Sequence, residues 1–302
     1  MIVVVAISTI TSMIEPGKTL RIKGSDTELQ LVSYFAESFV EAWRENNPDE
    51  KTRIVVEGGG SGTGITALIR GDIDIADSSR EIKPEEIVRA ESNGITPWEF
   101  IIARDALSII VHSNNPVDNL TMNELSKIYK GEITNWTEVG GKNKNITLYG
   151  RTSASGTYIF FRDHIVKGDY SQKMNNIVGN EAIVDAVETN ETGIGYVGVG
   201  YVITDTGEPI ETVKILNIAK DENSAAVSPL ETTNIKTGKY PIARPLYQYT
   251  AGKPEKGGLI YNFIKFELSD NGEQIVKEIG FYPITPEDKE HNDNQFAKIE
   301  AR

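Results

Sequence analysis

Three turns rich in glycine and hydroxyl residues constrain the fold of this chain more than any other feature. Each turn follows a strand-like apolar segment and precedes a helix-like segment; the turns span 24–27, 58–64 and 151–157. A fourth polar turn, 77–80, ends another strand-like segment. Strands that alternate with helices in this way are typical of an α/β fold. The start of a helix also carries unpaired N–H groups and the positive end of its dipole, so such turns can hold an anion.

The apolar pattern between the turns predicts the main elements. Segment 28–46 has apolar residues at helical spacing, and segment 106–114 is a strongly apolar strand. Segment 193–202 is expected to be a glycine-rich strand, and helices are expected to close the chain over 257–280. With 302 residues, the chain is long enough for two compact lobes.

Composition excludes several classes of site. The chain has no cysteine, which rules out disulfides and cysteine-ligated metals, and its three histidines are not spaced as a ligand pair. We therefore expect no metal and no cofactor. A net charge of −13 without a basic stripe argues against nucleic-acid binding and against docking on an anionic membrane. A recessed anion site remains compatible with that charge, because surface charges are screened beyond about 8 Å.

The first residues differ from the rest of the chain. Segment 2–10 is almost wholly apolar but too short to span a bilayer. It is interpreted as the remainder of an export signal or membrane tether, with a buried or edge strand as the alternative.

The polar turns offer donors of three kinds. Glycines admit a close backbone approach, serine and threonine add hydroxyls, and Arg80 and Arg151 could add bidentate bonds to an anion. Each turn also has an ordinary interpretation: Ser25 with Glu28 fits a capping box, and Ser155 or Thr157 fits a simple helix cap. The three turns together, with an arginine in the third, favour one shared anion site.

Signatures of catalysis are weak. Gly62–Ala67 fits a dinucleotide fingerprint, but no acidic residue ends the next strand in register to hold a ribose. There is no Walker A motif, and no serine of the turns lies in a GxSxG motif. We expect no catalytic residues and no enzyme.

These residues resemble those of a known family, the substrate-binding proteins of phosphate ABC transporters, within the two-lobed periplasmic-binding-protein class. The resemblance runs from about residue 20 to the C-terminal helices. Its most specific stretches are 105–136 and RTSASGT at 151–157; KGSDT, GGGSGTGI, IADSSREI, GIGYVGVGY and YPIARPLYQYT add weaker support.

The resemblance implies a set of ligand-binding residues. The third turn would hold phosphate through Arg151, Ser155, Gly156 and Thr157. The first turn would contribute Asp26 and Thr27, and the glycine-rich turn Ser61.

One departure from the family pattern concerns discrimination. The family places an aspartate at the end of the third strand, where it accepts the proton of phosphate; here that position is Ser79, followed by Arg80. Hydrogen phosphate carries a proton that sulfate lacks, so a carboxylate there rejects sulfate. We hypothesise that Asp26 takes this role, with Asp77 as the alternative. Ser79 and Arg80 complete the candidate ligand-binding set.

The resemblance also implies an architecture and a biological role. The fold would have two lobes, 18–108 with 247–302 and 109–246, with mixed sheets, flanking helices and a two-strand hinge; 1–17 would be the signal or tether remnant. The protein would be a monomeric extracytoplasmic receptor that captures inorganic phosphate and delivers it to an ABC transporter permease. Alternatives are a receptor for sulfate, molybdate or tungstate, a phosphate sensor, and an enzyme that acts on a phosphate ester.

Overall fold

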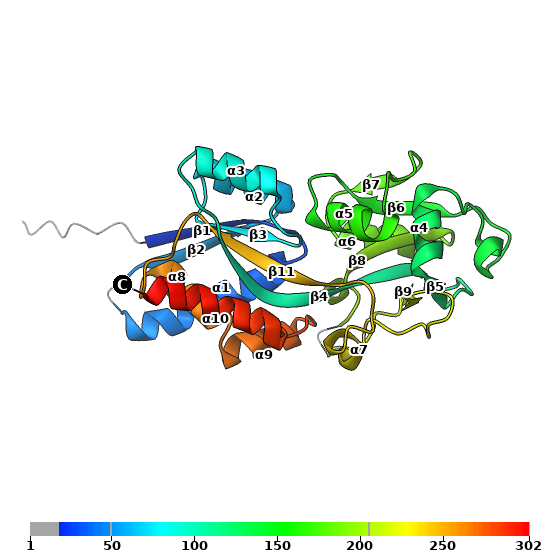
Figure 1. Ribbon diagram of the computed structural model, residues 1–302. Helices are drawn as coiled ribbons and strands as arrows, with labels where there is room; N and C mark the ends of the chain where they lie inside the picture. Colours follow the sequence, from blue (N-terminus) through cyan, green and yellow to red (C-terminus); the bar gives the residue numbers. More distant parts are fainter. Residues whose placement is uncertain (1–17, 49, 205, 302) are drawn as a thin grey trace, which may run out of the picture.

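The computed structural model describes residues 18–301, apart from residues 49 and 205, and is shown in Figure 1. The apolar segment 2–10, expected to be a signal or tether remnant, lies outside the described residues. Two halves lie side by side, joined by two long strands. We call the part with β1–β3, α1–α3 and α8–α10 the first half, and the part with β5–β10 and α4–α7 the second half; the bounds of these elements follow.

The first half has a sheet with helices on both faces (Figure 1). Helix α1 buries an apolar stripe that includes Val32, Phe35 and Phe39, and Phe39 packs edge-on against Phe263 of α8. Helices α2 and α3 cover the opposite face through a separate apolar cluster around Ile65, Leu68 and Ala90. The elements are β1 (Lys18–Gly24), α1 (Leu29–Asn46), β2 (Thr52–Glu57), α2 (Ser61–Arg70), β3 (Ile75–Ser78), α3 (Pro84–Ser92), α8 (Leu259–Glu267), α9 (Asp270–Glu278) and α10 (Pro286–Glu300).

The second half repeats this layering on a smaller scale. Helix α6 packs against one sheet face through Ile183 and Val187. On the other face, the Phe161 ring stacks on Tyr196 with centroids 4.1 Å apart. The elements are β5 (Asn119–Thr121), α4 (Met122–Lys130), η1 (Trp136–Val139), β6 (Thr147–Arg151), α5 (Gly156–Phe161), η2 (Arg162–Val166), β7 (Asn175–Ile177), α6 (Glu181–Glu188), β8 (Gly193–Gly198), η3 (Val199–Tyr201), β9 (Val213–Ile215), β10 (Asn217–Ala219) and α7 (Thr232–Lys236).

Two antiparallel strands, β4 (Trp98–His112) and β11 (Ala243–Thr250), run between the halves. They pair from Ala243 opposite Ala106 to Thr250 opposite Trp98. The sheet order is β2-β1-β3-β11-β4-β8-β6-β7, with β9 also on β4. The α/β class, the mixed sheets and the flanking helices are as predicted from the sequence.

Strand β4 begins at Trp98, eight residues before the expected start at 106. Charged residues interrupt the apolar pattern of this early part, but the fold satisfies each of them. The Tyr249 hydroxyl donates to Glu99, Arg104 pairs with Asp288, and Asp105 pairs with Arg244. A strand can therefore continue through charges when neighbouring elements supply their partners.

Local structure differs from the sequence expectations at two further points. The residue that caps α1 is Glu28, and its side chain makes no cap hydrogen bond, so the expected capping box from Ser25 to Glu28 does not form. The glycine-rich strand expected over 193–202 ends at Gly198 and passes into the short helix η3.

Candidate functional site

The polar turns of both halves meet between them. Strands β1, β2 and β3 are parallel, so their carboxyl ends lie at one edge of the sheet, and the turns that follow them lie together there. The turn after β6 reaches this edge from the second half. The Gly62 N–H donates to the Ala154 carbonyl at 3.0 Å, which joins the second and third turns directly.

Glycine is required where these turns touch. Gly60 has a φ of 93°, and a Cβ atom built on it would lie 2.6 Å from the Ala154 carbonyl oxygen. A Cβ atom on Gly156 would lie 2.2 Å from the Ser61 hydroxyl and 2.7 Å from that of Ser79. Any side chain at either position would therefore push the two halves apart.

Four buried hydroxyls, which we call the hydroxyl cluster, gather at this junction: those of Thr27, Ser61, Ser79 and Thr157. The Oγ1 atoms of Thr27 and Thr157 lie 3.0 Å apart, although their residues belong to different halves. The Ser79 Oγ atom lies 3.5 Å from Thr157 Oγ1 and 3.3 Å from Ser61 Oγ. Each hydroxyl can rotate to donate, so the cluster can present several donors to a single anion.

Helix starts reinforce the cluster. Ser61 is the first residue of α2 and Gly156 is the first residue of α5, so the positive ends of both helices point to the junction. Ser155 is the N-cap of α5: its Oγ accepts from the N–H groups of Thr157 at 3.1 Å and Tyr158 at 3.3 Å. The cap interpretation of Ser155 is thus confirmed, while its own hydroxyl proton remains able to bind an anion.

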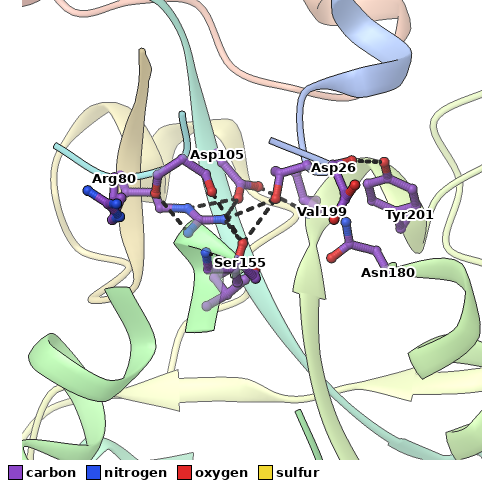
Figure 2. Close-up of polar contacts among 12 residues, drawn as sticks. Asp26, Arg80, Asp105, Ser155, Asn180, Val199 and Tyr201 are labelled. Atoms are coloured by element: carbon purple, nitrogen blue, oxygen red, sulfur yellow. Dashed lines mark hydrogen bonds and ion pairs between the residues drawn. The ribbon is translucent and has the colours of Figure 1, made fainter. Parts of the chain in front are cut away.

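Arg151 reaches across the junction to pair with Asp26. Figure 2 shows Asp26 with Asn180 and Tyr201 beside it. The Arg151 side chain is 2% exposed, and its guanidinium also donates to the Asn180 side chain at 2.9 Å. Burial lowers the pKa of Arg151, and the charge of Asp26 opposes that shift. Asp26 also accepts from the Gly59 N–H at 2.7 Å, and the Tyr201 hydroxyl donates to its backbone carbonyl.

Two buried donors near this ion pair have no hydrogen-bond partner among the described residues. They are Nε of Arg151 and Nδ2 of Asn180. Buried donors are almost always satisfied in folded proteins, so such a pair points to a ligand that accepts hydrogen bonds.

Arg80 does not join this group, contrary to the sequence expectation. Its guanidinium forms two bonds of 2.8 Å with the Glu86 carboxylate, and Figure 2 shows it turned away from the junction. Burial alone would raise the pKa of Glu86, but the bonds from Arg80 and the Lys83 N–H hold that pKa below its ordinary value. The first turn of α3 thus holds the Arg80 guanidinium through Nη1 and Nη2, away from the hydroxyl cluster.

Asp77 also lies apart from the hydroxyl cluster. Its carboxyl accepts from the Gln248 side chain at 3.1 Å, and Gln248 donates in turn to Glu267 of α8 at 3.0 Å. Burial raises the pKa of Asp77 to about 7. Two carboxylates were considered as acceptors for the proton of hydrogen phosphate. Only the Asp26 carboxylate is bonded to residues of the junction.

Sequence reasoning missed four residues that the structure places at the junction: Asn180, Tyr201, Asp105 and Arg244. Arg244 on β11 is 1% exposed and pairs with Asp105 on β4 through bonds of 2.8 and 3.1 Å. The available signal was a pair of opposite charges inside otherwise apolar strands, because such charges are rarely buried without a partner.

Two further features bear on function. The described part of the chain has no group of three or more histidine, aspartate or glutamate residues that could hold a metal ion. No helix in that same part is long and apolar enough to span a bilayer.

Comparison with known proteins decides the family. Residues 13–271 match the model of the PBP superfamily domain. The phosphate-binding protein PstS of Pseudomonas aeruginosa is 32% identical over 277 residues, covering 86% of this chain and 81% of that protein. PstS of Staphylococcus aureus is 35% identical over 268 residues, covering 87% and 77% respectively. The chain belongs to the PstS family of phosphate-binding proteins.

Solved structures of PstS-like proteins share this fold. A protein from Clostridium perfringens, whose crystal structure contains bound phosphate, aligns with a TM-score of 0.73 at 27% identity and covers 89% of this chain and 100% of its own. An ABC-type phosphate transport receptor from Vibrio cholerae aligns with a TM-score of 0.68 at 27% identity, covering 88% and 100%. The family resemblance seen in the turns therefore extends over most of the chain.

Proposed function

We propose that this protein captures inorganic phosphate between its two halves. The observation that carries the proposal is the hydroxyl cluster, in which Thr27 and Ser79 of one half meet Thr157 of the other. Arg151 pairs with Asp26, the residue before Thr27. The names of the PstS relatives and the phosphate in the Clostridium perfringens structure support the same ligand.

The charges at the junction are largely balanced, so an anion there would be held mainly by neutral donor groups and helix dipoles. Arg151 is already paired with Asp26, and Arg244 with Asp105, so the two arginines are neutralised within the protein. The remaining attraction comes from hydroxyls, backbone N–H groups and the starts of α2 and α5. These groups can surround four oxygen atoms without burying an unbalanced positive charge.

Binding would be coupled to closure of two lobes, 18–108 with 247–302 and 109–246. The bonds between Gly62 and Ala154 and between Arg151 and Asp26 are then contacts of the closed form. Strands β4 and β11 would act as the hinge, and a ligand that contacts both walls would favour the closed population.

Discrimination against sulfate is assigned to Asp26, through the proton of hydrogen phosphate. Its carboxylate already bonds to Arg151 and to the Gly59 N–H, which fixes it at the junction. A carboxylate in that position can accept a hydrogen bond from the protonated oxygen of phosphate. It would repel sulfate, which has no proton to donate.

The receptor would work outside the cytoplasm as a monomer and deliver phosphate to an ABC transporter permease. The names of the relatives support the association with transport, as for the Vibrio cholerae receptor. A receptor for sulfate, molybdate or tungstate would use the same fold with a different preference.

Calorimetry of phosphate-stripped protein with phosphate, sulfate, molybdate and tungstate tests this proposal. We expect saturable binding of phosphate at one site and much weaker heats with the other anions. Tight binding of another anion without phosphate binding would contradict the proposal. Turnover of a chromogenic phosphate ester would instead support an enzyme.

A further inference from the structure

We propose that Arg244, on the crossing strand β11, is a second anion-contacting arginine that links phosphate binding to the hinge. This inference rests on the proposed function, because it assigns a further residue to the same site. The sequence pattern assigned Arg244 no role, and its side chain is buried at the point where both halves and the crossing strands meet.

The contacts of Arg244 reach both halves. Its Nη2 atom lies 2.9 Å from Thr157 Oγ1 in the second half and 3.5 Å from Thr27 Oγ1 in the first. Its Nη1 atom donates to the Ser79 carbonyl at 3.0 Å. The guanidinium carbon also lies 5.1 Å from the centre of the Phe160 ring of α5.

The contacts of the guanidinium identify the hydrogen atom that is directed to the hydroxyl cluster. Nε and one Nη2 hydrogen are directed to Asp105, and Nη1 is directed to Ser79. The second Nη2 hydrogen is directed to the hydroxyls of Thr27 and Thr157. These hydroxyls can turn their protons to an anion, and the same N–H can then bond either to them or to an anion oxygen.

Asp105 fixes this arrangement and balances its charge. The carboxylate is fully buried, and it holds Arg244 through Oδ2 while Oδ1 accepts from the Val199 N–H at 3.2 Å. Figure 2 shows Asp105 and Val199 within the network of bonds around the junction. A guanidinium held on two edges loses little conformational freedom when it bonds to an anion, so its contribution to binding is large.

The position of Arg244 explains how phosphate binding would affect the hinge strands β4 and β11. It is the second residue of β11, and its backbone pairs with Asp105 of β4. An anion that bonds to its guanidinium is therefore held by the crossing strands as well as by both walls. Opening the lobes would have to break the contacts of Arg244 with one wall or the other.

The test removes the charge pair as a unit, because a lone buried Asp105 could unfold the protein. In the double variant Arg244→Gln/Asp105→Asn, we expect folded protein whose phosphate Kd is raised about 10- to 100-fold. The matched control is Arg104→Gln/Asp288→Asn, which removes an ion pair with bonds of 2.6 and 2.9 Å that joins β4 to α10, away from the junction. Calorimetry gives the Kd, and urea unfolding without phosphate gives the stability of each variant.

The two doubles separate binding from folding. The inference requires weakened binding only in the Arg244/Asp105 double, while the control double keeps the wild-type Kd even if its stability falls. A Kd within about twofold of wild type in the Arg244/Asp105 double would overturn it. If wild-type protein itself fails to bind phosphate, the proposed function is wrong, so the two failures are distinct. The single variant Arg244→Lys keeps the charge but loses the paired N–H donors of the planar guanidinium. It should bind phosphate more weakly than wild type and more tightly than the Arg244/Asp105 double variant.

Discussion

Asp26 of the first half and Arg151 of the second form an ion pair across the junction between the halves. The Arg151 side chain is 2% exposed and the Asp26 side chain 16%, so the pair is largely shielded from water. Such a contact can exist only when the two turns are close together. The pair therefore connects the closed arrangement of the chain to the residues that would hold phosphate.

Replacing Asp26 with Asn tests its role in discrimination. Asn keeps one oxygen that can accept from the Gly59 N–H, but it has no charge for Arg151. The NH2 group that replaces the second oxygen can only donate. We expect phosphate affinity to fall about tenfold or more and the preference for phosphate over sulfate to shrink.

Calorimetric titration with both anions measures this preference. Asp118→Asn is the control, because Asp118 is an exposed carboxylate paired with Lys214 at 2.7 Å. If the ratio of the phosphate and sulfate Kd values in Asp26→Asn equals that of wild type, Asp26 does not accept the phosphate proton.

Gly60→Ala should hinder closure without removing any ligand-binding group. The new Cβ atom would lie 2.6 Å from the Ala154 carbonyl oxygen of the other half. We expect phosphate affinity to fall at least about tenfold, since the closed form becomes less populated. Small-angle X-ray scattering with saturating phosphate should show a more extended molecule than wild type.

The control for this variant is Gly94→Ala. Gly94 has a similar φ of 79°, but nothing lies within 4 Å of the position that its Cβ atom would take, so the substitution carries the backbone strain alone. We expect it to lose about 1–2 kcal/mol of stability and to retain phosphate affinity. Equal affinities for both variants would show that the contact with Ala154 has no part in closure.

Thr157→Val should weaken binding because it removes the hydroxyl at the centre of the cluster. Thr157 Oγ1 lies within 3.5 Å of Thr27, Ser79 and Arg244 side-chain atoms. We expect a Kd about tenfold or more above wild type, while Thr157→Ser, which keeps the hydroxyl, should bind far better. Thr189→Val serves as the control, because the Thr189 hydroxyl bonds only within its own helix end, to Asp185 and Ala186 carbonyls. Wild-type affinity in Thr157→Val would contradict the assignment.

The anion-binding turns could be predicted from sequence because local chemistry marks them. Glycines and hydroxyls between a strand and a helix indicate a helix start, and the parallel strands then bring Thr27, Ser61 and Ser79 to one edge. The ordinary cap interpretation was also right for Ser155. Local pattern therefore predicts the turns that the fold brings together at this edge.

Long-range partners could not be predicted in the same way. Arg80 looked like an anion-binding residue, but Glu86 lies six positions along the chain and pairs with it. Arg244 and Asp105 are 139 positions apart, and only the pairing of β4 with β11 brings them together. Arg244 therefore meets Asp105 only through the tertiary fold, and the sequence near Arg244 carries no record of that partner.

The acid cluster formed by Glu28, Asp77 and Glu267 should make stability depend on pH. Burial raises the pKa of Asp77 from 3.8 to about 7; burial and the charge of Asp77 also raise the pKa values of Glu28 and Glu267. Gln248 and Arg244 face the cluster and lower these pKa values only in part.

The sign follows from comparing the folded and unfolded chains. Below pH 3.8 both forms keep the Asp77 proton, so the raised pKa has no effect. As the pH rises to about 7, the unfolded chain releases this proton and the folded chain keeps it, so the free energy of unfolding falls. Above that pH the loss is complete.

Asp77→Asn should remove much of this loss, because the amide oxygen can still accept from Gln248. We expect urea unfolding without phosphate to show the variant more stable than wild type at pH 8, by more than about 1 kcal/mol. At pH 4 the two proteins should nearly match. A constant difference across this range would mean that Asp77 does not titrate as described.

The most direct test of the central claim is a crystal structure of this protein with phosphate. We expect one phosphate between the halves, with its oxygens bonded to the hydroxyl cluster and to Arg151, and with Ala154 still against Gly62. A phosphate found elsewhere, or held by one half alone, would contradict it.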